Sequence, residues 1–198
     1  MPPRSVFVTD FDGTLTRREF YQLVAGRMTH AEAMARYCAL AGTDEAEVRR
    51  LASSLEPDPR FGELVRGLNA AGWEVVVASA GCEWYIRVAL EAFGVEVAVH
   101  SNRGRWVPGR GLVLEVPTGS PFFDPDVGVS KAAVVRDALG RADRVAFAGD
   151  GVTDVPAALL VEPGLRFAKA DCAAELDRRG EAYRRFDRWA EVAEALLS

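Results

Sequence analysis

Near its start the chain reads Val6-Phe7-Val8-Thr9-Asp10-Phe11-Asp12-Gly13-Thr14, a short apolar run that ends in two closely spaced carboxylates. An apolar, β-branched run of this length predicts a buried strand, and Asp-Gly predicts a turn directly after it. Residues two apart in a strand point to the same side. We therefore expect Asp10 and Asp12 to crowd one small space at the carboxyl edge of a sheet, where their repulsion calls for a cation. This pattern favours a hard divalent metal and leaves one carboxylate free to attack an electrophile, for which phosphorus fits best.

The composition is typical of one domain with an apolar interior. With 198 residues, of which 49% are hydrophobic, the chain can bury a full core and carry a small inserted lid. A formal net charge of −5 and the lack of a basic cluster argue against nucleic acid or an anionic membrane as a partner. Cys38, Cys82 and Cys172 are far apart, which argues against a disulfide framework or structural zinc. No apolar segment is long enough for a signal peptide or a bilayer span, so we expect a soluble cytoplasmic protein.

Apolar runs alternate with helical patterns along most of the chain. The runs that predict buried parallel strands are Val6–Thr9, Glu74–Ser79, Val145–Ala148 and Leu165–Ala168. Helices are expected at Phe61–Ala71, Glu83–Phe93, Lys131–Leu139, Asp154–Leu160, Asp171–Arg179 and Arg188–Leu197, with Gly72, Gly94 and Gly140 as helix stops. Alternating strands and helices predict an α/β fold, a Rossmann-like parallel sheet with helices on both faces.

Two segments interrupt this alternation. Residues 17–57 contain only helical patterns, Ala31–Ala41 and Thr43–Leu55, and end in a proline-rich linker. A helical insertion directly after the acidic strand end is well placed to act as a cap, so we expect a core of residues 1–16 and 58–198 and a cap of residues 17–57. Residues 95–117 predict a β-hairpin, and residues 118–128 a loop.

The carboxyl ends of the other predicted strands also carry polar residues. Ser79 follows the second strand, Asp150 and Asp154 follow the third, and Lys131 opens the helix before the third. Open α/β sheets bind ligands at this edge. Carboxylates that bind Mg²⁺, a fixed cation and a hydroxyl are the groups that phosphoryl transfer requires. The sequence therefore predicts a phosphoryl-transfer site.

These segments occur in the order of the four motifs of the haloacid dehalogenase (HAD) superfamily. The resemblance to this superfamily spans the whole chain. The motifs are Asp10-Phe-Asp-Gly-Thr, Ser79-Ala80-Gly81, Lys131 and Gly149-Asp150-Gly151-Val-Thr-Asp154. The resemblance implies a HAD-like core and a phosphatase that works through an aspartyl-phosphate. It implies that Asp10 is the nucleophile and that Asp12 protonates the leaving oxygen and then activates water.

The resemblance also implies roles for the remaining motif residues. Mg²⁺ would bind the Asp10 carboxylate, the Asp12 backbone carbonyl and Asp150. Ser79 and the Gly81 amide would hold phosphoryl oxygens. Asp154 would be an outer ligand or would orient Lys131.

The helical insertion resembles the cap of the phosphoserine phosphatase-like branch. Two groups of that branch, which act on different substrates, are candidates for this chain. Glu19 and Arg36 are spaced like the residues that bind the ammonium and carboxylate groups of phosphoserine. Gly13, Ala80 and Thr153 differ from the residues that phosphoserine phosphatases usually have at these positions. The segments from Gly149 onward look more like those of the methionine-salvage phosphatases. Those enzymes act on 2-hydroxy-3-keto-5-methylthiopentenyl 1-phosphate. Residues 118–130 contain no cysteine, unlike some of those relatives.

Other classes of protein compete with a phosphatase of a small phosphorylated metabolite. A phosphotransferase would pass the phosphoryl group of its aspartyl-phosphate to an alcohol instead of to water. A signalling receiver also uses acidic residues, Mg²⁺ and a lysine, but the order of its motifs differs and it has no cap. An inactive binding module is disfavoured because the motif set is complete. The protein is expected to be a monomer or a homodimer.

Overall fold

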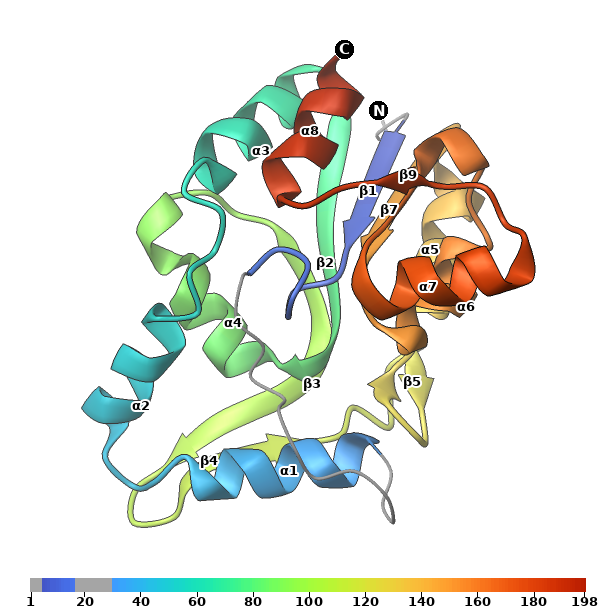
Figure 1. Ribbon diagram of the computed structural model, residues 1–198. Helices are drawn as coiled ribbons and strands as arrows, with labels where there is room; N and C mark the ends of the chain where they lie inside the picture. Colours follow the sequence, from blue (N-terminus) through green and yellow to red (C-terminus); the bar gives the residue numbers. More distant parts are fainter. Residues whose placement is uncertain (1–4, 17–29) are drawn as a thin grey trace.

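The computed structural model describes residues 5–16 and 30–198, and its centre is a seven-stranded sheet (Figure 1). Neighbouring strands are parallel except for the last two along one edge, which are antiparallel. In order across the sheet they are β4 (Gly111–Glu115), β3 (Ala98–Val107), β2 (Trp73–Cys82), β1 (Ser5–Thr9), β7 (Arg144–Gly149), β8 (Arg166–Ala168) and β9 (Arg184–Arg185).

Helices cover both faces of this sheet. One face carries α3 (Phe61–Ala70), α4 (Glu83–Leu90) and α8 (Trp189–Leu197), and the other carries α5 (Lys131–Arg141), α6 (Val155–Ala158) and α7 (Ala170–Arg179) (Figure 1). Alternate side chains of β1 supply both cores, because Phe7 packs with the first set of helices whereas Val6 and Val8 pack with the second. The predicted α/β fold class is confirmed.

The predicted strands are present, with shifted ends. β2 continues three residues beyond Ser79, to Cys82, where it pairs with Asn102 of β3. The expected helix at Asp154–Leu160 is present as the shorter α6, which follows a 3₁₀ turn, η2 (Val152–Asp154). β9 was not predicted, because two exposed arginines carry no strand pattern.

Two of the three predicted glycine stops are confirmed. Gly72 and Gly94 follow their helices with φ of +84° and +60°, a conformation that other residues rarely adopt. Gly140 is not a stop, since α5 continues to Arg141. A 3₁₀ turn, η1 (Glu91–Phe93), lies between α4 and Gly94, and a second, η3 (Pro163–Leu165), precedes β8.

The predicted β-hairpin is present and is formed by β3 and β4. β3 and β4 pair from Arg103–Glu115 to Val107–Gly111, so the turn lies at 108–110 and Asn102–Gly104 is inside β3. The first half of β3 instead extends the parallel sheet beside β2. The predicted loop at 118–128 contains a two-residue strand, β5 (Phe123–Asp124), which pairs with β6 (Gly128–Val129).

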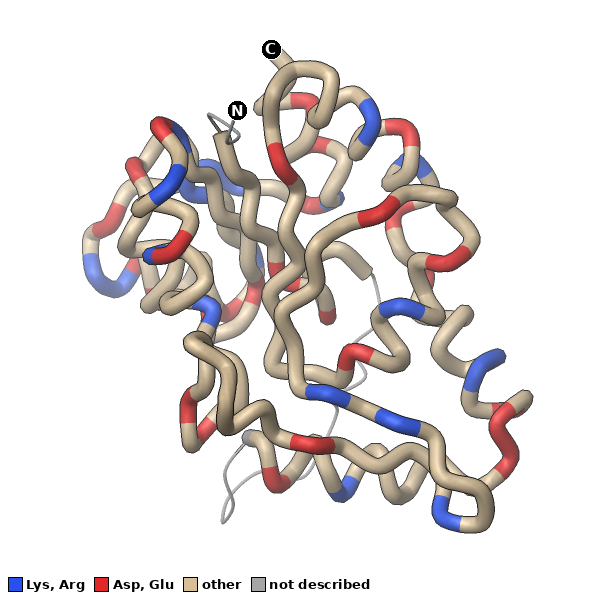
Figure 2. The backbone as a smooth tube through the Cα atoms, turned by 180° about the vertical axis from the view of Figure 1, so that it is seen from behind, with Lys and Arg blue, Asp and Glu red and all other residues tan. Residues whose placement is uncertain are grey.

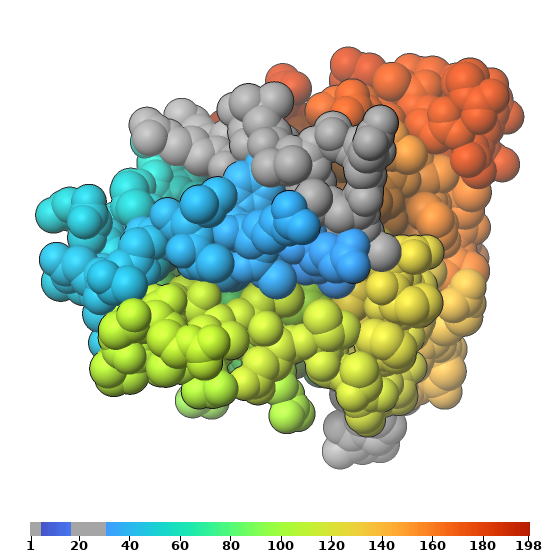
Figure 3. Space-filling view, turned by 90° about the horizontal axis from the view of Figure 1, so that it is seen from below, coloured from blue at the N-terminus to red at the C-terminus, as the bar shows by residue number. Residues whose placement is uncertain are grey.

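Two helices of the predicted cap are described, α1 (His30–Leu40) and α2 (Glu45–Ser53). α1 lies against β4 (Figures 1 and 3), and α2 lies against α4 (Figure 1). α2 is capped by Asp44, not by the expected Thr43: the Asp44 carboxylate accepts hydrogen bonds from the Ala46 and Glu47 amides. Thr16 and Pro57 form an isolated β-bridge, so the two ends of the predicted insertion lie side by side. The division into core and cap stays a prediction.

Acidic and basic residues are interspersed over the outer helices (Figure 2). Several form ion pairs one turn apart, such as Glu83 with Arg87 and Asp137 with Arg141. In the described parts of the chain, no helix combines the length and the apolar character that crossing a bilayer requires. The exclusion of nucleic acid and membrane partners stays a prediction.

We expect Phe7→Ala to destabilise the fold strongly, because Phe7 is fully buried and stacks on Trp189 at a ring-centroid distance of 5.8 Å. Removing a buried phenyl ring costs about 3–5 kcal/mol of unfolding free energy. Urea unfolding of Phe7→Ala and of Leu139→Ala, whose side chain is exposed, measures the difference. Equal midpoints for the two variants would contradict this packing.

Candidate active site

Asp10 lies between two strand ends at the carboxyl edge of the sheet. Thr9 pairs with Val77 of β2 on one side and with Ala148 of β7 on the other. The Asp10 amide donates a hydrogen bond of 2.9 Å to the Ala148 carbonyl. The strand register thus places Asp10 beside the residues that come after Val77 in β2 and after Ala148 in β7, as expected for a parallel sheet.

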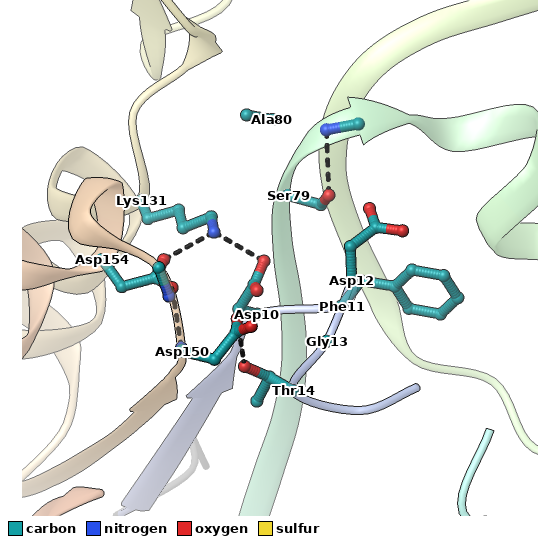
Figure 4. A network of polar contacts seen from close by, with 12 residues as sticks. Asp10, Phe11, Asp12, Gly13, Thr14, Ser79, Ala80, Lys131, Asp150 and Asp154 are labelled. Atoms are coloured by element: carbon teal, nitrogen blue, oxygen red, sulfur yellow. Dashed lines mark hydrogen bonds and ion pairs between the residues drawn. The ribbon is translucent and has the colours of Figure 1, made fainter. Parts of the chain in front are cut away.

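Lys131 joins two of the predicted carboxylates (Figure 4). Its Nζ donates to Asp10 Oδ1 and to Asp154 Oδ1, both at 2.5 Å. All three side chains are buried. Lys131 is the first residue of α5, and the preceding Ser130 caps this helix by accepting from the Ala133 amide. The helix therefore fixes the backbone from which the ammonium group reaches the two carboxylates.

Asp154 is held by the strand end as well as by Lys131. Its Oδ2 accepts hydrogen bonds of 2.9 Å from the Asp150 and Gly151 amides. A Cβ at Gly149 would lie 2.6 Å from the Asp154 side chain, so this close approach requires glycine. Asp150 in turn accepts a hydrogen bond of 2.9 Å from the Thr14 hydroxyl. The geometry agrees with the orienting role for Asp154 that the resemblance implies.

Burial controls the protonation of this cluster. It raises the pKa of Asp10 from 3.8 to about 7; Lys131 opposes this rise and Asp150 adds to it. Burial likewise raises the pKa of Asp150 and of Asp154. Burial disfavours the charged form of Lys131, but the adjacent Asp10 and Asp154 carboxylates outweigh this effect and raise its pKa. The site gathers three carboxyl groups where burial disfavours their ionised forms.

The cluster fits a divalent cation. Asp10, Asp150 and Asp154 each offer a carboxylate oxygen, and these oxygens lie within 4.8 Å of one another. Lys131 is a single positive charge against three buried carboxylates, and hard oxygen ligands are those that Mg²⁺ prefers. The Asp12 carboxylate lies apart from this cluster, where its Oδ2 accepts a hydrogen bond of 2.7 Å from the Tyr85 hydroxyl. The predicted ligand role of the Asp12 backbone carbonyl stays a prediction.

The Ser79–Gly81 segment lies where β2 and β3 change register, between Ala78 and Cys82. Such an irregularity re-aims side chains and backbone groups at the end of a strand. The Gly81 amide donates a hydrogen bond of 2.9 Å to Ser79 Oγ (Figure 4). A hydroxyl and an amide thus lie together, across from the Asp10 carboxylate.

β3 holds this segment from behind. The Ser101 hydroxyl donates to the Gly81 carbonyl at 2.9 Å, and the Asn102 amide group donates to the Ala80 carbonyl at 2.8 Å. Asn102 also donates to the Val127 carbonyl at 3.2 Å, which ties in the loop before β6. These bonds fix the Ser79–Gly81 segment in a buried position.

A cavity of about 520 Å³ opens onto these groups. Seven of the predicted site residues line it: Asp10, Asp12, Ser79, Gly81, Lys131, Asp150 and Asp154. Met34 of α1 also lines it, so a residue of the predicted cap reaches the cavity. Arg36 does not, because it follows Met34 by two residues and so lies on another side of the helix, where it is exposed. Glu19 lies outside the described residues.

Residues of the site that were not assigned from the sequence include Thr14, Met34, Tyr85 and Asn102. Thr14 follows the acidic motif directly, so its position could have suggested a contact with Asp150. Met34, Tyr85 and Asn102 carry no local pattern that distinguishes them from core residues, and only the fold brings them to the site.

A family model for the haloacid dehalogenase-like hydrolases matches residues 20–159, which is more than half of the chain. The chain therefore belongs to the haloacid dehalogenase-like hydrolases, and the predicted family is confirmed. The match begins after Asp10 and Asp12, so it does not test the roles of these two residues.

Relatives of this chain include two proteins with quite different lengths. The chain is 27% identical over 138 residues to a phosphoserine phosphatase of Idiomarina loihiensis, covering 65% of this chain and 58% of that protein. It is 26% identical over 153 residues to the copper-transporting ATPase HMA4 of Oryza sativa subsp. japonica, covering 77% of this chain. The chain thus spans 58% and 13% of the lengths of these relatives.

Solved structures share the fold over the whole chain. A HAD family hydrolase of Salmonella enterica subsp. enterica serovar Typhi matches with a TM-score of 0.71 at 15% identity, covering 100% of this chain and 72% of that one. A phosphoserine phosphatase of T. onnurineus matches with a TM-score of 0.65 at 18% identity, covering 100% and 98%. These likenesses confirm a HAD-like fold with phosphoserine phosphatase-like structural neighbours.

We expect Asp10→Asn to stabilise the protein in EDTA, increasingly so as the pH rises. The pKa of Asp10 is higher in the folded protein (about 7) than its ordinary 3.8, so the stability that protonated Asp10 contributes is fully present below pH 3.8 and lost as the pH rises through about 7. Asparagine does not ionise, so the melting temperature of the variant relative to the unchanged protein should increase by on the order of 5 °C from pH 4.5 to pH 8.

Thermal melts of both proteins in EDTA across this pH range measure the effect. Added Mg²⁺ should narrow the gap at pH 8, because a cation that binds the native cluster stabilises the unchanged protein more. A difference in melting temperature that does not vary with pH would contradict the raised pKa.

Proposed function

We propose that the protein is a Mg²⁺-dependent phosphatase that hydrolyses a small phosphorylated metabolite through an aspartyl-phosphate on Asp10. The observation that carries this proposal is the buried Asp10, which is paired to Lys131 and lies beside Asp150 in the cavity. Membership of the haloacid dehalogenase-like hydrolases and the phosphoserine phosphatase relative agree with this reaction class.

In the proposed first step, an Asp10 oxygen attacks phosphorus while the bond from phosphorus to the leaving oxygen breaks. Asp12 gives its proton to that oxygen, and the product alcohol leaves. In the second step, water attacks the phosphorus of the aspartyl-phosphate as Asp12 takes a proton from the water. Inorganic phosphate leaves and the Asp10 carboxylate is restored.

The surrounding groups would bind and orient the phosphoryl group. Lys131 supplies a fixed positive charge beside the Asp10 carboxylate. Ser79 Oγ and the Gly81 amide, which are hydrogen-bonded to each other, would turn toward phosphoryl oxygens. Asp10, Asp150 and the Asp12 carbonyl would hold Mg²⁺, with Asp154 as an outer ligand. When bound, the cation would neutralise negative charge on the phosphoryl group and on the carboxylates.

The predicted cap of residues 17–57 would cover the cavity during the reaction. Met34 of α1 already lines the cavity, and the Thr16–Pro57 bridge brings the two ends of the insertion together at the edge of the core. Such an arrangement allows the insertion to exclude water and to contact the leaving group.

For the substrate we propose the methylthiopentenyl phosphate of methionine salvage, with phosphoserine as the competing candidate. The departures at Gly13, Ala80 and Thr153 favour the first. The name of the Idiomarina relative favours the second. The exposed position of Arg36, which does not line the cavity, argues against its predicted contact with the phosphoserine carboxylate.

We expect Mg²⁺-dependent phosphate release from a panel that contains both candidates, and none in EDTA. Asp10→Asn should lower the rate by at least about 10³-fold, because the nucleophile is lost. Asp137→Asn, an exposed change on α5, is the matched control and should keep full activity. Phosphate release that survives in Asp10→Asn would overturn the proposed mechanism.

The same assay separates the remaining classes. A phosphotransferase would give a new phosphate ester when alcohols are added, with less free phosphate. A receiver or an inactive binding module would release no phosphate from any compound of the panel. A preference for the methylthiopentenyl phosphate or for phosphoserine in kcat/KM identifies the substrate.

A further inference from the structure

The Asp12 carboxylate is in contact with a residue that belongs to none of the four motifs. The Tyr85 hydroxyl of α4 donates a hydrogen bond of 2.7 Å to Asp12 Oδ2. We propose that Tyr85 is a positioning residue for Asp12: its hydroxyl holds Oδ2, so that Oδ1 is the oxygen that gives and takes the proton. This inference rests on the proposed function, in which Asp12 is the acid and then the base.

Tyr85 is held firmly enough to position another side chain. It is fully buried, and α4 begins directly after β2 ends at Cys82. Its ring lies 6.0 Å from the ring of Phe11, the residue between the two aspartates. Strand β2 and Phe11 therefore tie the phenol to the same backbone segment that carries Asp12.

Gly81 leaves the space through which the hydroxyl reaches Asp12. A Cβ on Gly81 would lie 1.8 Å from the Tyr85 hydroxyl oxygen and 3.0 Å from Asp12 Oδ2. Any side chain at this position would thus displace the Tyr85–Asp12 contact. The glycine therefore serves the contact with Asp12 as well as the predicted binding of phosphoryl oxygens by its amide.

The hydrogen bond has a chemical consequence for proton transfer. A phenol is a hydrogen-bond donor at neutral pH. A carboxylate oxygen that accepts this hydrogen bond is less favourable for protonation than the other oxygen. When Asp12 is protonated, its proton therefore resides on Oδ1. That proton goes to the leaving oxygen as the bond to phosphorus breaks, and Oδ1 later takes a proton from the attacking water. The O–H bond of Tyr85 is not broken at any step.

Without the Tyr85 hydroxyl, the Asp12 carboxyl group would lose the hydrogen bond that holds Oδ2, and Oδ2 would become a better place for its proton. The loss should affect the reaction in proportion to its need for an acid. An alkoxide is a poor leaving group and needs the proton, whereas p-nitrophenolate leaves without one. A change that merely loosens the fold would instead lower the rate for every leaving group alike.

The experiment compares Tyr85→Phe with the unchanged protein on an alkyl phosphate and on p-nitrophenyl phosphate. We expect kcat/KM for the alkyl phosphate to fall about 10- to 100-fold, the effect of losing a hydrogen bond to a charged group. The fall for p-nitrophenyl phosphate should be less than about threefold, because this leaving group needs little acid catalysis. Asp12→Asn should show the same selectivity with a larger loss, about 10²- to 10⁴-fold.

Tyr183→Phe is the matched control. It removes another tyrosine–aspartate hydrogen bond, from the Tyr183 hydroxyl to Asp177 at 3.0 Å, on an exposed surface outside the cavity. It should leave both substrates unaffected. If Tyr85→Phe does not fold, Tyr85→Met fills the space without a hydroxyl and allows the same comparison. The ratio between substrates does not depend on the fraction of protein that is folded.

Two kinds of failure are distinguishable. Equal losses on both phosphates in Tyr85→Phe, with selective loss in Asp12→Asn, would overturn the positioning role and leave the proposed function standing. No phosphate release by the unchanged protein, or release that persists in Asp10→Asn, would overturn the proposed function itself.

Discussion

The site depends on one buried interaction, the contact of the Lys131 ammonium with Asp10 and Asp154. Both distances are 2.5 Å, and all three groups are almost wholly removed from solvent. An isolated charge in this position would cost several kcal/mol, so the Lys131 ammonium is tolerable there only beside carboxylates. Because the three residues come from the position directly after β1, from the start of α5 and from η2 before α6, their mutual neutralisation also links the segments that carry them.

The parallel sheet makes this contact possible without long excursions of the chain. β1 lies between β2 and β7, so the residues after three neighbouring strands meet at one edge (Figure 1). Crossover helices return the chain to the opposite edge each time, which leaves the carboxyl edge open to a cavity. The chemistry lies on short segments after rigid strands, where backbone hydrogen bonds such as that from the Asp10 amide to Ala148 fix each position.

Much of this arrangement could be predicted from the sequence, because its signals are local. An apolar run followed by Asp10 and Asp12 indicates both a strand and its polar end, and the order of the later motifs indicates Lys131, Asp150 and Asp154. The contact between Tyr85 and Asp12 joins residues 73 positions apart and depends on where β2 ends, which no local pattern states. The position of Arg36 outside the cavity lining has a similar cause. Helical spacing separates Arg36 from Met34, but only packing against β4 determines which side of α1 lines the cavity.

Among the described residues, the three buried carboxylates outnumber the one ammonium group that contacts them, and this excess of carboxylates has a functional meaning. Burial raises the pKa of Asp10, Asp150 and Asp154 together, so at neutral pH the folded chain holds these groups at a cost in stability. A cation relieves that cost, and it does so only in the folded protein, where the three oxygens are gathered. The fold therefore supplies the energy that would favour metal binding, and the same electrostatics would keep Asp10 ionised as a nucleophile once the cation is present. The Lys131 ammonium offsets part of the repulsion between the carboxylates, and the negative charge that remains favours the binding of a cation.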